Sequence, residues 1–194
     1  MRRFLSFAAV AAFAVMGALR AQEPWDASFQ LSAGSFSGAR EAGMGQEAVL
    51  GLTLEGAYPL LKQGDLVLEG GIRLLPKART ESADLAVEER TEGFMGGLAY
   101  RHRFGPGRLE GLFVQAGLRA SRLESQRTTV DLLDGARLRE KGPATLAVGP
   151  ALAAGFRFND ALSLQVTAFR MKAEAPEGLR KTGTVLELGL GIHL

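Results

Sequence analysis

The chain has 194 residues, a formal net charge of +2 and no cysteine. The nearly balanced charge gives no electrostatic footprint for nucleic acid, and without cysteine there are no disulfides or cysteine-based metal sites. Beyond residue 18 no apolar run approaches the roughly 20 residues of a membrane-spanning helix, so a membrane-embedded chain must form a closed β-barrel.

The N-terminus has the pattern of a secretory signal peptide. Arg2 and Arg3 precede an almost uninterrupted apolar run from Phe4 to Ala18, and "GALRAQ" offers Ala21 as the small residue before a cleavage site. We therefore predict that residues 1–21 direct export and are removed. Residues 22–194 then form one domain.

The rest of the chain contains eight segments in which apolar side chains recur at every second position. This pattern is typical of β-strands whose two faces meet different surroundings. Most of them have about the length that a tilted strand needs to cross a bilayer. The eight segments are 25–33, 47–58, 65–74, 94–104, 112–120, 144–158, 161–168 and 184–194.

The connections between these segments alternate in length. Three are short (59–64, 105–107 and 159–160), whereas the other four are long and charged (35–46, 76–92, 121–142 and 170–183). Short turns at one rim and long loops at the other are typical of an outer-membrane barrel. Asp134–Gly135 is a hairpin signal within the third long loop, so we expect some strands to continue beyond the lipid as ribbons.

The composition of the second face indicates which side meets lipid. If the apolar face pointed inward, the other face would meet water and carry dense Lys, Glu and Thr. It carries mostly Gly, Ala and Ser instead, which suit the crowded interior of an eight-stranded barrel. We therefore predict an apolar face in lipid and a polar lumen.

A few charges of both signs fall on the lumen side, where they could pair. They are Glu55, Glu69, Arg73, Arg101, Arg103, Arg119, Arg157 and Glu187. One interpretation is a salt-bridged plug, with Glu55 and Glu69 on neighbouring strands beside Arg101 and Arg103. The alternative is a narrow passage past the small residues. Side chains can just fill an eight-stranded barrel, which favours the plug.

Aromatic residues gather where the segments approach the short connections. Trp and Tyr favour the membrane interface, so the sequence predicts an aromatic girdle at the periplasmic rim. The alternative is that strand ends carry aromatic residues simply for packing. The predicted girdle consists of Trp25, Tyr58, Tyr100, Phe104, Phe156 and Phe158.

The signal peptide, the eight alternating segments and the rhythm of the loops resemble the small outer-membrane β-barrel proteins of Gram-negative-type bacteria. The resemblance is architectural and covers residues 22–194. It implies an all-β, eight-stranded, antiparallel up-and-down transmembrane barrel in the cell outer membrane, surrounded by outer-membrane lipid. It also implies that the barrel-assembly machinery reads the closing strand, although this strand ends on Leu194 and not on the usual aromatic residue.

No group of residues points to catalysis or metal binding. Neither His102 nor His193 falls near the outer rim, and no Ser or Asp lies at a motif spacing from either histidine. We therefore predict no catalytic site, no cofactor and no metal. The long loops carry solvated carboxylates and offer a place for a surface ligand.

These observations predict a non-catalytic outer-membrane barrel that is structural, adhesive or a narrow passage for small solutes. Two alternatives remain open. One is a soluble periplasmic barrel that binds an apolar ligand. The other is a lipid-modifying enzyme, which would need a His–Ser/Asp cluster near the outer rim.

Overall fold

The structure, a computed structural model, describes residues 25–39, 47–107, 109–174 and 180–194. The predicted signal peptide, residues 1–21, lies outside these residues. The described residues form strands and turns, and no helix among them is long and apolar enough to cross a membrane. The strands are β1 (Asp26–Ala39), β2 (Glu47–Leu61), β3 (Gly64–Glu81), β4 (Leu85–Arg103), β5 (Leu112–Asp131), β6 (Arg137–Lys141), β7 (Thr145–Arg157), β8 (Leu162–Glu174) and β9 (Arg180–His193).

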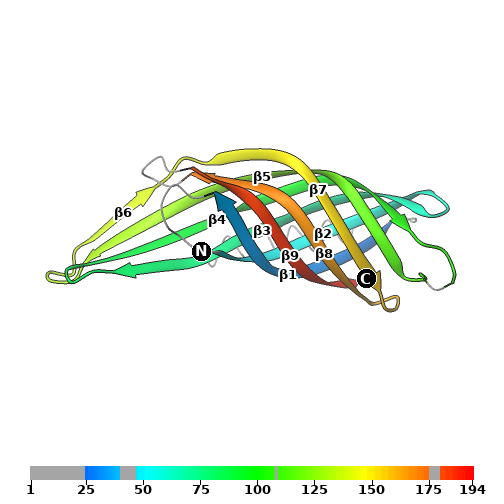
Figure 1. The fold of residues 1–194 in the computed structure, drawn as a ribbon, viewed down its shortest axis with the longest axis horizontal. Coiled ribbons are helices and arrows are strands. Elements are labelled where there is room, and N and C mark those ends of the chain that lie inside the picture. The colour runs from blue at the N-terminus through cyan, green and yellow to red at the C-terminus, as the bar shows by residue number, and fades with distance from the viewer. Residues whose placement is uncertain (1–24, 40–46, 108, 175–179) are drawn as a thin grey trace.

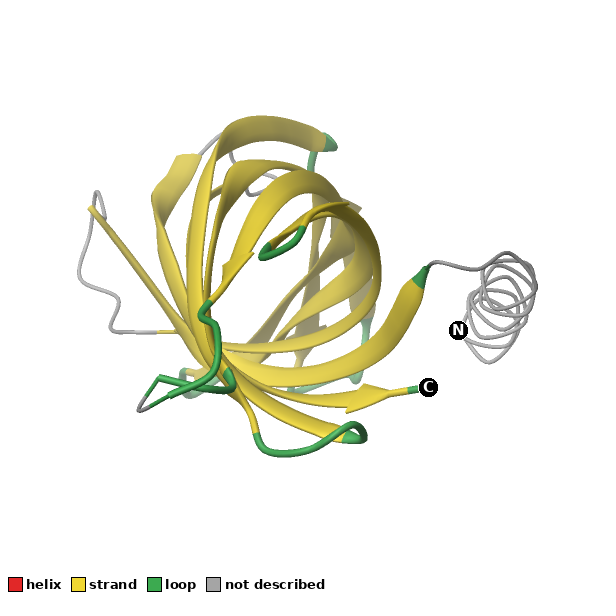
Figure 2. Cartoon of the chain, turned by 90° about the vertical axis from the view of Figure 1, so that its right-hand side faces the viewer, coloured by secondary structure: helices red, strands yellow, loops and turns green. Residues whose placement is uncertain are grey.

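Eight of the strands close into an antiparallel barrel, as predicted. Their order is β4-β3-β2-β1-β9-β8-β7-β5, and β4 also pairs with β5, so the sheet returns on itself (Figure 2). The first and last strands form one of the joins, with partners from Ser28↔His193 to Ala39↔Thr182. A closed barrel leaves no strand edge unpaired around the ring, which is what a bilayer demands of a β-structure.

The apolar side chains point outward, as the alternation predicts. Leu118 and Leu188 are 61% and 53% exposed, whereas Thr53 and Arg73, on the other face of the wall, are each 1% exposed. An exposed wall with this many leucines would be strongly unfavourable in water, because each buried apolar side chain gains about 1.5–3 kcal/mol on leaving it. The barrel wall is therefore built for hydrocarbon.

The long strands continue beyond one end of the barrel as a ribbon (Figure 1). Strand β3 stays paired with β4 as far as Glu81↔Ala86, and β4 with β5 as far as Leu85↔Asp131. Strand β6 adds a fourth strand by pairing with β5. Gly135 follows Asp134 in the connecting turn with φ of 74°, a conformation that favours glycine. The Asp–Gly hairpin signal and the expected ribbon are both confirmed.

Three prolines mark departures from a regular ladder. The β2–β3 register shifts between Pro59 and Leu61, so β2 runs further into the predicted turn than the sequence indicates. On β7, pairing with β8 starts at Ala151↔Phe169, directly after Pro150, while pairing with β5 continues through Pro150. Pro76 lies within the register shift between β3 and β4. Proline has no N–H to donate to a ladder, so all three positions coincide with a local change in pairing.

Two equally exposed leucines, one in the barrel wall and one in the ribbon, test whether the wall is surrounded by lipid. Leu118 in the barrel wall and Leu138 in β6 are both 61% exposed. We expect Leu118→Arg to destabilise the barrel in phospholipid vesicles by about 2–4 kcal/mol, because the charge enters the middle of the bilayer. Urea titrations followed by Trp25 fluorescence measure this. Leu138→Arg should leave stability unchanged, and equal effects of the two substitutions would contradict the orientation of the wall.

Candidate functional site

Inward-facing charges from five strands meet in the lumen as three Arg–Glu pairs. All six side chains are buried, with exposed fractions between 1% and 8%. The pairs are Arg101 (β4) with Glu55 (β2), Arg119 (β5) with Glu69 (β3), and Arg73 (β3) with Glu187 (β9). Every pair joins residues far apart in the chain, so each one ties together strands across or around the barrel.

One of the pairs is bidentate. Arg119 Nε lies 2.5 Å from Glu69 Oε1, and its Nη2 lies 2.6 Å from Oε2. Two parallel hydrogen bonds of this kind satisfy a buried carboxylate with both geometry and charge. In the Arg73–Glu187 pair, Nη2 donates to Oε2 at 2.9 Å, whereas Nε lies 2.6 Å from Oε1 without the geometry of a hydrogen bond.

Neutral side chains extend the network. Thr53 Oγ1 accepts a hydrogen bond from Arg73 Nη1 at 2.9 Å, and Ser32 Oγ donates to Glu187 Oε2 at 3.2 Å. Gln115 Oε1 accepts from Arg101 Nη2 at 3.0 Å. Such partners matter because a buried ion pair is stable only when its remaining donors and acceptors are also satisfied.

Apolar side chains fill the lumen on the outer side of the ion pairs. On β2, β3 and β9, Val49, Leu75 and Val185 occupy the next inward positions beyond Gly51, Arg73 and Glu187. They belong to one buried cluster: Phe36, Val49, Leu75, Leu123, Ala151, Phe169, Met171 and Val185. The pattern of small and polar residues on the lumen face does not predict this layer, because each strand contributes only one or two of its members.

A second, smaller apolar cluster lies toward the other end of the lumen. Ala57, Val67 and Ala99 form it, and the first two lie one inward position from Glu55 and Glu69, toward the short turns. The Arg101 guanidinium carbon lies 4.8 Å from the Phe113 ring centroid, close enough for a cation–π contact. Apolar and aromatic side chains therefore contact the charges on both sides, although Arg101 itself lies one inward position beyond Ala99 toward the short turns.

Inward glycines make room for the long charged side chains. A Cβ at Gly51 would collide with Ser32 and the Arg73 guanidinium, and one at Gly97 would collide with the Glu69 carboxylate. The small inward residues that the sequence predicts thus lie beside large side chains, which occupy the space that the small residues leave. Small and large side chains together fill the narrow interior.

The remaining two predicted lumen charges lie at the rim that carries the short turns. The Arg103 side chain is 46% exposed and contacts Asp65 at 2.8 Å, while that of Arg157 is 31% exposed and contacts Asp26 at 2.8 Å. Asp26 and Asp65, which the sequence analysis did not single out, each stand at or next to the first residue of a strand. These two ion pairs link the end of β4 to the start of β3 and the end of β7 to the start of β1.

The predicted girdle residues also lie toward the short-turn rim. The rings of Trp25 and Tyr58 are 5.3 Å apart, and those of Phe156 and Phe158 are 5.2 Å apart. Tyr100 is 41% exposed on the outer wall, and Phe104 packs edge-on against His102 at 5.2 Å. Pairs of aromatic rings at this end agree with the interface preference of such side chains.

The fold brings partners to His193 that the sequence spacing does not reveal. His193 Nε2 lies 3.0 Å from Ser163 Oγ, and Nδ1 lies 3.6 Å from Asp26 Oδ1. The three residues come from β9, β8 and β1. Because they are far apart in the chain, the sequence spacing around His193 does not predict these partners. Ser163 is 6% exposed, and Asp26 is held by Arg157. We therefore interpret the group as a structural cluster, or clasp, that links β8, β9 and β1 where the first and last strands pair.

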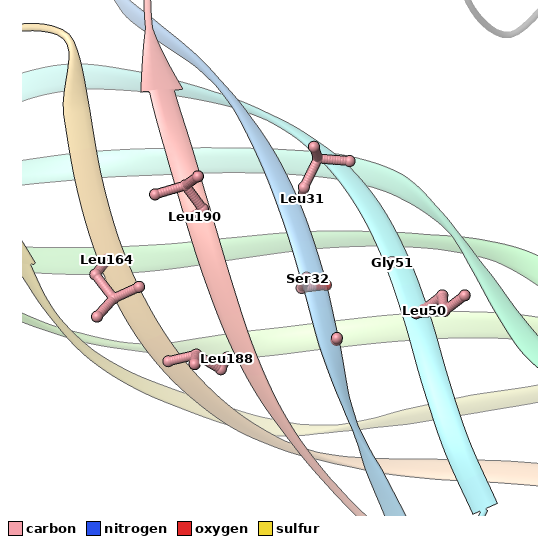
Figure 3. Close-up of a pocket in the computed structure, with 8 residues that line it drawn as sticks. Leu31, Ser32, Leu50, Gly51, Leu164, Leu188 and Leu190 are labelled. Atoms are coloured by element: carbon pink, nitrogen blue, oxygen red, sulfur yellow. The ribbon is translucent and has the colours of Figure 1, made fainter.

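The outer wall carries a shallow apolar groove of about 430 Å³. Leucines projecting from β1, β2, β8 and β9 surround it (Figure 3), and its surface is almost entirely apolar. Its lining residues are Leu31, Ser32, Ala33, Leu50, Gly51, Leu164, Leu188 and Leu190. The groove therefore belongs to the lipid-facing wall. Within the described residues, no group of three or more His, Asp or Glu side chains could hold a metal ion.

Comparison with solved structures identifies the architecture. The chain is similar to Ail, the attachment invasion locus protein of Yersinia pestis, solved with the heparin analogue sucrose octasulfate; the TM-score is 0.58 at 12% identity, over 89% of this chain and all of Ail. Neisserial surface protein A matches with a TM-score of 0.51 at 10% identity, over 88% of this chain and 96% of that one.

A major outer membrane protein from Thermus thermophilus also matches, with a TM-score of 0.50 at 14% identity, over 87% of this chain and 99% of that one. No family model and no curated protein matches the sequence. Together with the leucine-covered wall, the three structures identify the fold as a small eight-stranded outer-membrane β-barrel and support a place in the cell outer membrane.

The buried ion pairs can be tested by removing one partner or both. We expect Arg119→Met to destabilise the barrel by about 3–5 kcal/mol, because the Glu69 carboxylate is then buried without its partner. The double variant Arg119→Met/Glu69→Leu should recover most of that loss, as measured by urea unfolding in vesicles. Lys141→Met, which breaks the exposed 3.2 Å pair with Glu124, should cost no more than about 1 kcal/mol. A double variant as unstable as Arg119→Met would contradict the pairing.

Proposed function

We propose that the protein is a non-catalytic outer-membrane barrel whose lumen is closed by its own side chains and which holds a ribbon at the cell surface. Its role is then structural or adhesive. The observation that supports this best is the set of three buried Arg–Glu pairs, with an apolar cluster on their outer side. In this proposal residues 1–21 are removed on export, and the barrel-assembly machinery reads β9.

Closure of the lumen is favoured over a solute passage on physical grounds. A continuous water path would solvate the guanidinium and carboxylate groups and leave them partly exposed, whereas Arg73, Arg119 and Glu187 are each no more than 3% exposed. The outer apolar cluster adds a layer that offers a polar solute no hydrogen bonds. A passage would require both layers to rearrange.

The two other function classes find less support. A soluble barrel that binds an apolar ligand would turn its leucines inward, but Leu118 and Leu188 are on the outer wall. A lipid-modifying enzyme would need its reactive side chains near the outer rim, but the His193 cluster joins strands at the opposite rim. The similar barrels are named as an attachment protein, a surface protein and a major outer membrane protein, and none of these names denotes an enzyme.

The ribbon is the part of the described chain that reaches furthest from the barrel, so we assign the surface role to it. Strands β3, β4, β5 and β6 form it, and its exposed residues include several arginines. Ail, which has the same type of fold, was solved with a sulfated saccharide analogue. By analogy, we propose that this protein binds a surface ligand through the ribbon.

Closure can be measured as conductance in planar lipid bilayers. We expect the wild-type barrel to give no resolved current steps, because the ion pairs and the outer apolar cluster block the path of ions. A variant that shortens side chains in both layers (Glu69→Ala/Arg119→Ala with Leu123→Ala) should conduct. Leu118→Ala, on the outer wall, is the matched control and should remain silent. Regular current steps from the wild-type protein would contradict a closed lumen.

A further inference from the structure

Every strand of the ring is paired on both sides, but the ladder between β7 and β8 covers only part of the two strands. This ladder ends at Ala151↔Phe169. Beyond that point β7 stays paired with β5, and β8 with β9, to the ends of the strands. Residues 145–150 of β7 and 170–174 of β8 thus continue side by side without a ladder, and we call this stretch the outer seam.

The backbone of the seam has hydrogen-bonding groups without ladder partners. Phe158 N–H donates to the Leu162 carbonyl at the start of β8. Because the direction of the backbone groups alternates along a strand, the other even-numbered residues of β7 also point toward β8. Leu146 and Val148 are among them, and they lie beyond the end of the ladder. Pro150, at the point where the ladder ends, has no N–H to extend it.

The seam lies at the level of the outer leaflet. In the β5–β7 ladder, Pro150 is opposite Leu118 in the middle of the wall, and Leu146 is opposite Arg122, the first charged residue on the outward face of β5. Leu146 and Val148 are 66% and 67% exposed and face lipid. Hydrocarbon offers no hydrogen bond to a free N–H or C=O group, so the seam is less stable than the paired joins around it.

The two strands touch at the seam, but their pleats do not match. Gly149 occupies an inward position of β7, whereas Arg170 is exposed on the outward face of β8. A Cβ added at Gly149 would nevertheless lie 3.3 Å from the Cβ of Arg170. In a regular ladder, residues opposite each other point to the same face of the sheet. The seam can therefore part without breaking a regular ladder.

The outer apolar cluster lies directly behind the seam. Phe169 and Met171 on β8 point inward and are only 2% and 1% exposed, and they pack in this cluster with Leu123 and Ala151. Met171 has an unbranched, flexible side chain that adapts its shape readily. The interior next to the seam is therefore apolar, like the lipid outside it.

The ion pairs close this apolar region on its inner side. The guanidinium carbons of Arg119 and Arg73 lie 4.6 Å and 5.9 Å from the centroid of the Phe169 ring. Both arginines are held by buried glutamates. An apolar molecule among the cluster side chains would have to desolvate and separate these charges to go further, which is costly. The cluster is thus bounded by the seam on one side and by charges on the other.

We propose that the outer apolar cluster binds a single acyl chain, which enters sideways from the outer leaflet through the seam. The inference goes beyond the proposed structural or adhesive role, and it requires neither the ribbon nor an open lumen. A hydrocarbon chain suits the site because the cluster offers dispersion contacts and no hydrogen bonds. Met171 makes room by changing its rotamer, and the ion pairs limit how far the chain enters. The chain belongs to a phospholipid or to a free fatty acid.

Entry of the chain is tested by photolabelling the mature protein in phosphatidylcholine vesicles. The probe is palmitic acid with a diazirine group in its chain, and the labelled residues are mapped by peptide mass spectrometry. We expect labels on Leu123, Phe169 or Met171 in the lumen, in addition to labels on outward residues such as Leu146. Labels on outward residues alone would overturn the proposal.

A disulfide across the seam provides a reversible block. Gly149→Cys/Arg170→Cys places the two Cβ atoms close to the separation found in disulfides, and the chain has no other cysteine. We expect oxidation of this variant to lower the lumen label at least about tenfold, because the fraction of molecules with an open seam falls. Reduction should restore the label. Equal lumen labels in the two states would overturn entry through the seam.

A matched control places the disulfide in the paired part of the same two strands. Ala153 and Thr167 are partners in the β7–β8 ladder, so Ala153→Cys/Thr167→Cys links residues that the ladder already holds together. This variant should keep the wild-type lumen label in both redox states. A loss as large as that of the seam variant would contradict a specific role of the seam.

A second probe identifies the source of the chain. It is phosphatidylcholine with the same diazirine group in one acyl chain. Lumen labels from this lipid would support the site and assign it to a phospholipid chain, whereas lumen labels from the fatty acid alone would support the site and assign it to a free one.

The outcome is separable from the proposed closure of the lumen. The oxidised and the reduced seam variant should both remain silent in planar bilayers, because the ion pairs are unchanged. A conducting wild-type barrel that carries lumen labels would contradict closure and leave the acyl-chain site intact. A silent barrel without lumen labels would do the reverse.

Discussion

Hydrocarbon solvates every second side chain of the barrel wall, and the rest of the structure depends on this constraint. It requires leucine, valine and phenylalanine on the outer face and a closed ring of backbone hydrogen bonds, because lipid offers no partner to a free N–H or C=O group. Within the lipid-spanning part of the wall, polar side chains must therefore point into the lumen. The join of β1 and β9 completes the ring, and the clasp of Ser163, His193 and Asp26 sits at that join.

The narrow interior then determines how charges can be stable. Three Arg–Glu pairs are buried in the lumen, where an unpaired charge would be costly, and hydroxyl and amide groups take up part of their remaining hydrogen-bonding capacity. Glycines such as Gly51 and Gly97 provide the space that an arginine or glutamate side chain occupies. Closure of the lumen and stability of the barrel therefore arise from the same side chains.

Strand β5 passes from the short-turn rim through the lipid-facing wall into the ribbon, and its sequence differs in each of these three parts. Near the short turns it packs Phe113 and Gln115 inward, and in the middle it places Leu118 in lipid and Arg119 in the lumen. Toward its far end it becomes an inner strand of the ribbon, between β4 and β6. Because the strand is continuous, the ribbon is held rigidly on the barrel by the ladder with β4. A rigid support of this kind suits a binding surface at the cell exterior.

Local patterns in the sequence determined the eight barrel strands, their outward faces, the alternation of loop lengths and the Asp134–Gly135 hairpin, since each depends on neighbouring residues. The tertiary structure alone decided that Arg119 meets Glu69, that Arg103 and Arg157 lie at the rim, and that His193 meets Ser163 and Asp26. It also assembled the outer apolar cluster from residues such as Phe36, Val49 and Leu123. The physical reason is that alternation tells which face a residue occupies, whereas the stagger of the strands sets its height along the barrel, and height determines which side chains from distant strands come into contact.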